Sequence, residues 1–123
     1  MRLSHLGLPV RDVQRSRHFY ETYFGFDPST AQRYEDGTVI VRNAEDFDLA
    51  LHTVEKVDRS PEFLHFGFRV PAPDDVRSLL ARLKADGVET IETYDEPEYV
   101  AFKALDPDGH RVETYWEPIA SED

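Results

Sequence analysis

The chain has 123 residues, of which 40% are hydrophobic and 12% aromatic, so it can bury a modest folded core. Its 14 basic and 25 acidic residues give a formal net charge of −11, which disfavours nucleic acid and anionic membrane surfaces as partners. It contains no cysteine, which excludes disulfide bonds, thiolate catalysis and zinc–thiolate sites. No apolar run approaches the roughly 20 residues of a membrane span, and charges interrupt the N-terminal segment, so we expect a cytoplasmic protein without a secretory signal.

The first half of the chain predicts a strand, a helix and three further strands. The first strand is His5–Val10, with the sequence HLGLPV. The helix lies within residues 11–26, where Asp12 is the expected N-cap and Gly25 the expected end. The three later strands are expected around Ala31–Tyr34, within residues 37–43 and within residues 46–55.

The second half repeats this order of elements. Its first strand, His65–Val70 (HFGFRV), has His, Gly and Val at the same places as the first copy and Phe in place of both leucines. The next helix lies within residues 71–89, with Asp74 or Asp75 as the expected cap and Gly87 as the expected end. The remaining strands are expected around Thr90–Tyr94, within residues 98–105 and within residues 109–118, the last two being joined by the turn sequence DPDG.

These elements predict an α+β fold made of two βαβββ modules. Module 1 covers residues 1–58, approximately, and module 2 residues 62–119, within one domain that spans residues 1–123. Ser60 and Pro61 are the expected linker. We expect the strands to form a cupped mixed β-sheet, with the helices on its outer face.

The alternation of side chains along the strands places three metal-binding residue types on the faces away from the helices. Leu6, Leu8 and Val10 share the helix-packed face of the first strand, so His5 points the other way. His65 and Glu113 have the same parity in their own strands. Two imidazoles and one carboxylate form a triad that leaves coordination positions open for substrate or oxygen. We therefore predict that His5, His65 and Glu113 hold a divalent metal ion.

The chain resembles the vicinal oxygen chelate superfamily, which includes glyoxalases, bleomycin-resistance proteins and extradiol dioxygenases. The resemblance covers the whole chain and is carried by HLGLPVRDVQRSRHFYETYFGF, by EFLHFGFRV and by FKALDPDGHRVETYWEP. It implies paired βαβββ modules around a divalent metal, with His5, His65 and Glu113 at the positions of the ligands. The ion is Fe(II), Mn, Ni, Zn or Mg, among which this ligand set does not choose.

One position departs from the glyoxalase I pattern, in which the last strand of the first module supplies a fourth ligand, usually Glu. Here that strand offers Ala50 or His52 on the relevant face, and Asp48 lies further back. His52 is therefore a fourth ligand, a proton carrier or an exposed residue, and it is the best-placed general base by parity. Tyr115 is a candidate hydrogen-bond donor to a bound oxyanion. For Tyr99 we favour packing.

The resemblance leaves two functions open. The first is a metal-dependent enzyme, dioxygenase-like or lyase/isomerase-like, that acts on a small substrate with adjacent oxygens. The second is a metal-free protein of the bleomycin-resistance type that sequesters a drug or metabolite, and the acidic charge suits a cationic ligand. Arg69 and Arg111 share the parity of the triad and could bind a substrate carboxylate or form surface ion pairs. We expect a homodimer in either case, with modules paired within or between chains.

Overall fold

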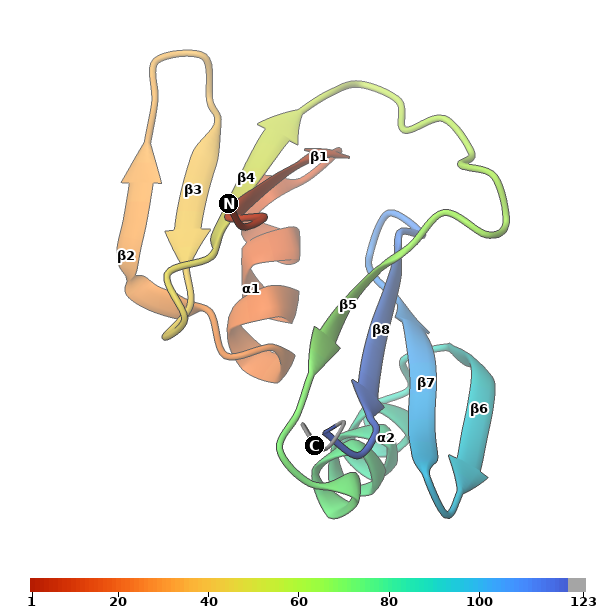
Figure 1. The fold of residues 1–123 in the computed structure, drawn as a ribbon. Coiled ribbons are helices and arrows are strands. Elements are labelled where there is room, and N and C mark those ends of the chain that lie inside the picture. Colours follow the sequence, from red (N-terminus) through yellow and green to blue (C-terminus); the bar gives the residue numbers. More distant parts are fainter. Residues whose placement is uncertain (120–123) are drawn as a thin grey trace. The chain divides into compact units, whose positions relative to one another are not determined.

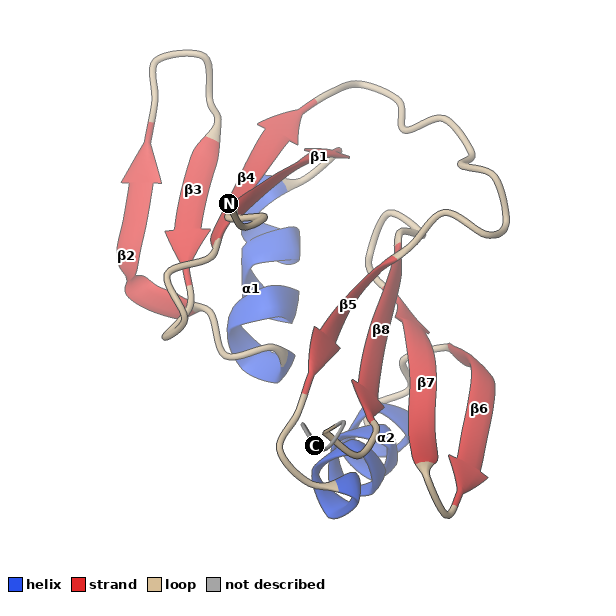
Figure 2. Ribbon diagram, in the orientation of Figure 1, coloured by secondary structure: helices blue, strands red, loops and turns tan. Residues whose placement is uncertain are grey.

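Each half of the chain forms one βαβββ unit in the computed structural model, which describes residues 1–119 (Figure 1; Figure 2). The chain divides into two compact units between Arg59 and Ser60. The elements of the first unit are β1 (His5–Val10), α1 (Val13–Tyr23), β2 (Asp27–Arg33), β3 (Val39–Arg42) and β4 (Asp48–Thr53). Those of the second are β5 (Phe66–Arg69), α2 (Pro73–Ala85), β6 (Thr90–Glu96), β7 (Tyr99–Leu105) and β8 (Arg111–Trp116).

The two units have the same sheet topology. In the first unit the strand order is β1-β4-β3-β2, and in the second it is β5-β8-β7-β6. The first strand of each unit pairs in parallel with the last one, and the other pairs are antiparallel. Within each unit one helix packs against one face of its own sheet (Figure 2). The opposite face of each sheet is not covered by the helix of its own unit, and the candidate site residues lie on or beside this helix-free face.

The pairing registers show which residues of the two units are equivalent. Gly7 of β1 lies opposite Ala50 of β4, and Gly67 of β5 lies opposite Glu113 of β8. Two residues further on, Pro9 lies opposite His52, and Arg69 lies opposite Tyr115. Ala50 thus occupies in the first unit the position of Glu113 in the second, and His52 occupies that of Tyr115.

The helix ends show which local signals were read correctly. Asp12 caps α1, because its side chain accepts a hydrogen bond of 3.1 Å from the backbone N–H of Arg15. Gly25 and Gly87 follow their helices with positive φ angles of 72° and 78°, as expected for glycines at helix ends. The expected cap of α2 was wrong. The N-cap is Ala72, because Pro73 takes the first helical position and the Asp75 carboxylate accepts from the Ala72 N–H.

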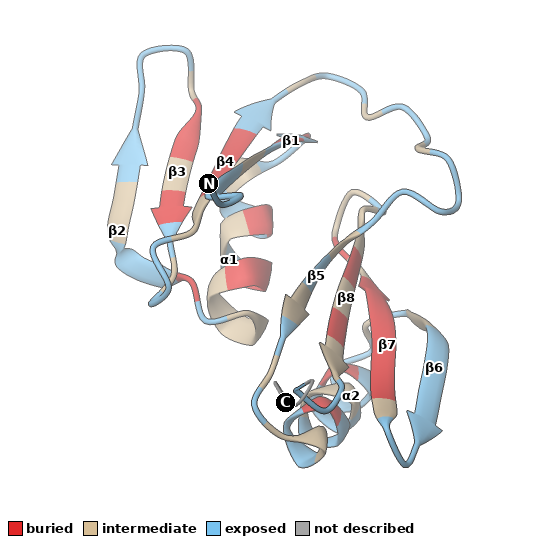
Figure 3. Ribbon diagram, in the orientation of Figure 1, coloured by how far each residue is buried: buried red, intermediate tan, exposed pale blue. Residues whose placement is uncertain are grey.

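Burial follows the predicted alternation in β1, β5 and β8, whereas β4 and β7 contain runs of three and five consecutive buried residues (Figure 3). Leu8 and Val10 of β1 are buried, whereas His5, Gly7 and Pro9 are exposed. In β8, Val112 and Thr114 are buried, and Glu113 and Tyr115 are only half-buried. The most completely buried side chains of the two units include Tyr20, Phe26, Leu49, Leu51, Leu83 and Phe102.

Some element bounds differ from the expectation. β5 begins at Phe66, so His65 lies just before the strand, and β2 begins at Asp27, well before the expected Ala31. The start of β2 escaped prediction because DPST is a turn-like sequence, and its residues fold on themselves through the Asp27 carboxylate. Within residues 1–119, neither helix has the length and apolarity needed to cross a membrane.

Candidate metal and substrate site

His65 and Glu113 lie together on the helix-free face of the second unit. The Nε2 atom of His65 is 3.9 Å from the Oε2 atom of Glu113. His65 Nδ1 is 2.8 Å from the carbonyl oxygen of Phe63, which can only accept, so Nδ1 carries a hydrogen. In the neutral imidazole this leaves the lone pair on Nε2, the nitrogen that faces the carboxylate. A backbone carbonyl that fixes the other ring nitrogen is the usual support of a histidine ligand.

The spacing of these two groups suits a divalent ion better than a direct hydrogen bond. A separation of 3.9 Å is too long for a hydrogen bond. It is shorter than twice a typical metal–ligand distance of about 2.1 Å, so one ion can contact both atoms. The donor set, one imidazole nitrogen and one carboxylate oxygen, is also the chemistry that Fe, Mn, Ni and Zn accept. These residues therefore fit the metal that the sequence predicts.

Gly67 makes room for Glu113. It lies opposite Glu113 in the β5–β8 register, and a Cβ atom placed on it would be 3.2 Å from the Glu113 Cβ and 3.5 Å from its Oε1. The Cβ of Glu113 is attached directly to a paired backbone, so it cannot move aside cheaply. In the first unit, the equivalent Gly7 makes room for His52, whose Nε2 would be 3.2 Å from an added Cβ.

We expect Gly67→Ala to weaken the binding of Mn(II) by about 10-fold, because the added methyl displaces the Glu113 carboxylate, an effect in the range of other changes that misplace ligands. Isothermal titration with Mn(II) measures it. Gly7→Ala is the matched control, since it adds the same methyl at the equivalent glycine, where the nearest atoms belong to the His52 ring and not to Glu113. An affinity of the Gly67→Ala variant equal to that of the wild type would show that the close approach to Glu113 has no bearing on metal binding.

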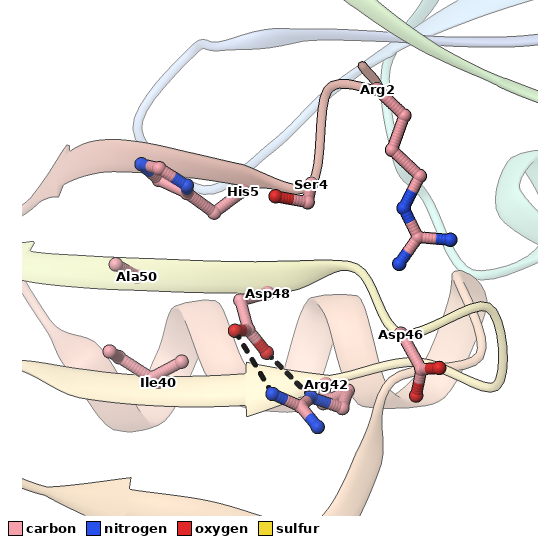
Figure 4. Close-up of a pocket in the computed structure, with 8 residues that line it drawn as sticks. All are labelled: Arg2, Ser4, His5, Ile40, Arg42, Asp46, Asp48 and Ala50. Carbon is pink, nitrogen blue, oxygen red and sulfur yellow. Dashed lines mark hydrogen bonds and ion pairs between the residues drawn. The ribbon is translucent and has the colours of Figure 1, made fainter.

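His5 lies in the first unit, at the place equivalent to His65. It lines an open hollow of about 470 Å³ on the helix-free face of that sheet. Figure 4 shows His5 with the other residues that line this hollow. Asp48 lies opposite His5 in the β1–β4 register, and Arg42 binds the Asp48 carboxylate at 2.8 and 3.2 Å. That ion pair lowers the pKa of Asp48 below its usual value. Within neither unit, over residues 1–119, do three or more His, Asp or Glu side chains gather closely enough to hold a metal.

His52 is exposed and partly fixed in orientation. Its Nδ1 is 3.1 Å from the hydroxyl oxygen of Thr38, and its ring lies over Gly7. The backbone N–H of Thr38 also donates to Asp36 at 2.9 Å, and this bond is the main cause of the lowered pKa of Asp36, to which nearby His52 adds. Because Ala50, and not His52, is equivalent to Glu113, the first unit has no donor side chain at the position that Glu113 occupies in the second.

Tyr115 and the two arginines are engaged within the second unit. The Arg69 guanidinium carbon is 5.9 Å from the centre of the Tyr115 ring. The same guanidinium group donates to the side-chain carboxylate of Glu117 at 3.3 Å and to the backbone carbonyl oxygen of Glu117. Arg111 donates to the carbonyl oxygen of Pro61 at 2.8 Å. Tyr99 is half-buried, with its ring 5.9 Å from that of Tyr94. Burial, and then the negative charge of Glu113, raise the pKa of Tyr99.

Two residues of this face were missed by sequence reasoning. Lys103 lies opposite Glu113 in the β7–β8 register, and its Nζ is 3.8 Å from Glu113 Oε2 and 2.8 Å from Glu92 Oε2. Lys103 could have been found, since it is the one charged residue inside the apolar strand YVAFKAL and has the parity of the site. Glu92 could not, because its position depends on an irregularity of β6.

The structure thus contains two βαβββ units of the same topology, each with a histidine just before or at the start of its first strand. The chain belongs to the glyoxalase/bleomycin resistance protein/dioxygenase superfamily, whose model matches residues 2–114. The fold and family expected from the sequence are thereby confirmed.

Several known proteins are similar to this chain. The glutathione transferase FosA of Serratia marcescens is 31% identical, over 97% of this chain and 83% of its own length. A trivalent organoarsenical cleaving enzyme of Bacillus sp. (strain MD1) is 26% identical, over 94% of this chain and 73% of its own. Among solved structures, the fosfomycin resistance protein FosX of Listeria monocytogenes, complexed with Mn(II) and sulfate, has a TM-score of 0.79 at 19% identity, covering 96% of this chain and 91% of FosX.

Proposed function

We propose that the protein is a divalent-metal-dependent enzyme of this superfamily that acts on a small substrate with adjacent oxygen atoms, with dioxygenase-like or lyase/isomerase-like chemistry. The observation that carries the proposal is the His65–Glu113 pair, in which Nδ1 is bound by a carbonyl and Nε2 faces a carboxylate across 3.9 Å. His5 is the proposed third ligand, by its equivalence to His65 in the repeat. The Mn(II) bound by FosX supports a divalent ion.

The bound ion would supply Lewis acidity, which stabilises negative charge on chelating substrate oxygens. The chain's own residues would do the rest. His52 is the proposed acid or base, because its ring is exposed and oriented by Thr38. Tyr115 is the proposed donor to a substrate oxyanion, with its ring held in place by Arg69. The alternative role of His52 as a further ligand is less favoured, since the ligand position of its strand is taken by Ala50.

The relatives suggest which substrates to test first. Fosfomycin carries vicinal oxygens in its epoxide and phosphonate, and the names of FosA and FosX link this scaffold to glutathione transfer and to fosfomycin resistance. Cleavage of a trivalent organoarsenical fits less well, because trivalent arsenic prefers soft thiolate ligands and the chain has no cysteine. We therefore place small oxygen-rich anions and catechols ahead of arsenicals.

We expect one divalent ion per chain in protein purified without added metal and without an affinity-tag histidine run, as measured by elemental analysis. The metal-loaded protein is then tested with fosfomycin plus a thiol and with catechols under oxygen. Cationic antibiotics are tested for binding only. Tight binding of such an antibiotic by a protein that takes up no metal would favour the sequestering function, to which the net charge of −11 is suited. Light scattering tests the proposed homodimer.

A further inference from the structure

We propose that Glu92 is a positioning residue that holds the Lys103 ammonium group away from Glu113, so that the Glu113 carboxylate stays available to a divalent cation. The inference rests on the proposed metal site and adds a residue pair to it. Neither Glu92 nor Lys103 is a proposed ligand. Their effect on the metal is exerted through Glu113.

Lys103 lies near two carboxylates and is hydrogen-bonded to only one of them, that of Glu92. Its Nζ is 2.8 Å from Glu92 Oε2, a charge-assisted hydrogen bond, but 3.8 Å from Glu113 Oε2. The same Glu113 oxygen is 3.9 Å from His65 Nε2. Glu113 Oε2 therefore has an ammonium nitrogen and an imidazole nitrogen at 3.8 and 3.9 Å, and it makes a hydrogen bond to neither of them.

Burial explains why this choice matters. The side chain of Lys103 is 11% exposed and that of Glu113 is 16% exposed, so water screens both poorly. A nearly buried ammonium group requires a hydrogen-bonded partner of opposite charge. If Glu92 did not supply it, Glu113 would be the nearest carboxylate. A hydrogen-bonded Lys103–Glu113 pair, in place of the present looser ion pair at 3.8 Å, would neutralise more of the charge on which a divalent ion depends. The hydrogen bond from Lys103 also lowers the pKa of Glu92, which keeps that carboxylate charged.

Glu92 has an unfavourable backbone conformation, which directs its carboxylate toward Lys103. Glu92 has a φ of 50°, a left-handed conformation that a non-glycine residue rarely adopts. It lies in the register shift of β6 between Ile91 and Tyr94. Such bulges re-aim a side chain, and strained conformations of this kind persist where the surrounding structure demands them. Here the side chain reaches from an edge strand to the partly buried Lys103.

The test is a set of Mn(II) affinities measured by titration calorimetry on the full chain, for the wild type and for Glu92→Gln, Lys103→Met and the double variant. We expect Glu92→Gln to weaken Mn(II) binding by about 10-fold or more, the size of other effects transmitted through a ligand. Adding Lys103→Met should restore the affinity, since no ammonium group is left to pair with Glu113. Asp95→Asn is the control, because it removes one charge from the same strand while Asp95 pairs with Arg77 and not with Lys103.

The outcomes separate this inference from the proposed function. A wild type that binds no Mn(II) overturns both. A wild type that binds Mn(II), with Glu92→Gln equally tight, overturns the role of Glu92 alone. The role of Glu92 is also overturned if the double variant binds Mn(II) as weakly as Glu92→Gln does. It is overturned as well if Asp95→Asn lowers the Mn(II) affinity as much, because either result would point to a general loss of charge or of fold. If Glu92→Gln does not fold, Glu92→Asp, which shortens the side chain by one methylene, is measured in its place.

Discussion

Replacing both His65 and Glu113 by Ala is expected to abolish the binding of a divalent ion while the second unit stays folded. The expectation rests on their shared geometry, since one ion can contact both His65 Nε2 and Glu113 Oε2. Residues that only orient a ligand cost about 10–100-fold in affinity when changed, so the loss of two ligands should exceed about 1,000-fold. The fold should persist because neither side chain belongs to the buried apolar core.

Metal content by elemental analysis and Mn(II) affinity by calorimetry measure this result, with circular dichroism as the check on folding. His18→Ala combined with Glu98→Ala is the matched control, because both residues are exposed and lie in α1 and in the turn after β6. The control removes the same two residue types and should keep its metal. A double His65/Glu113 variant that retains full occupancy would remove the basis of the proposed site.

Phe102→Ala is expected to lower the free energy of unfolding by about 3–5 kcal/mol. Phe102 is fully buried in β7, between β6 and β8, with the parity opposite to that of Lys103. Truncation would leave a cavity on the face of β7 that packs against α2. The strand cannot shift to fill this cavity, because it is paired with β6 and β8. Because domains of this kind are stable by only about 5–15 kcal/mol, the loss is a large share of the total.

Urea unfolding followed by fluorescence and circular dichroism measures this change. Phe63→Ala is the control, since Phe63 is 82% exposed, and its substitution should change the unfolding free energy by no more than about 0.5 kcal/mol. Equal losses in the two variants would mean that Phe102 does not carry the packing that its burial indicates.

The faces of the strands could be predicted because side chains alternate with a period of two. Once the strands were recognised, Val10 had to point to the other face of its strand from His5, and Val112 to the other face from Glu113. Both valines are buried, as this alternation requires. The fold could be predicted from the internal repeat, since two copies of one sequence pattern predict two copies of one structural unit. The helix starting at Pro73 was misjudged by two to three residues, because a cap assignment that favours Asp overlooks proline at the first helical position.

Specific side-chain contacts could not be predicted from the sequence. Nothing in the residue order indicates that His65 donates to the carbonyl of Phe63, because this bond depends on the path of the chain before β5. The pairing of Lys103 with Glu92 depends in the same way on a register shift that no local composition marks. The metal and catalytic roles of His5, His65, Glu113, His52 and Tyr115 stay predictions that the variants above would test.

The alanine at position 50 has an electrostatic consequence. It stands where the second unit has Glu113, so the proposed ligand set contains a single carboxylate. A divalent ion held by two neutral imidazoles and that one carboxylate retains a net positive charge, whereas a second carboxylate would cancel it. In a protein whose formal net charge is −11, the proposed centre would then be a local positive point in a negative field. The proposed centre would therefore favour a ligand that brings its own negative oxygens to the ion.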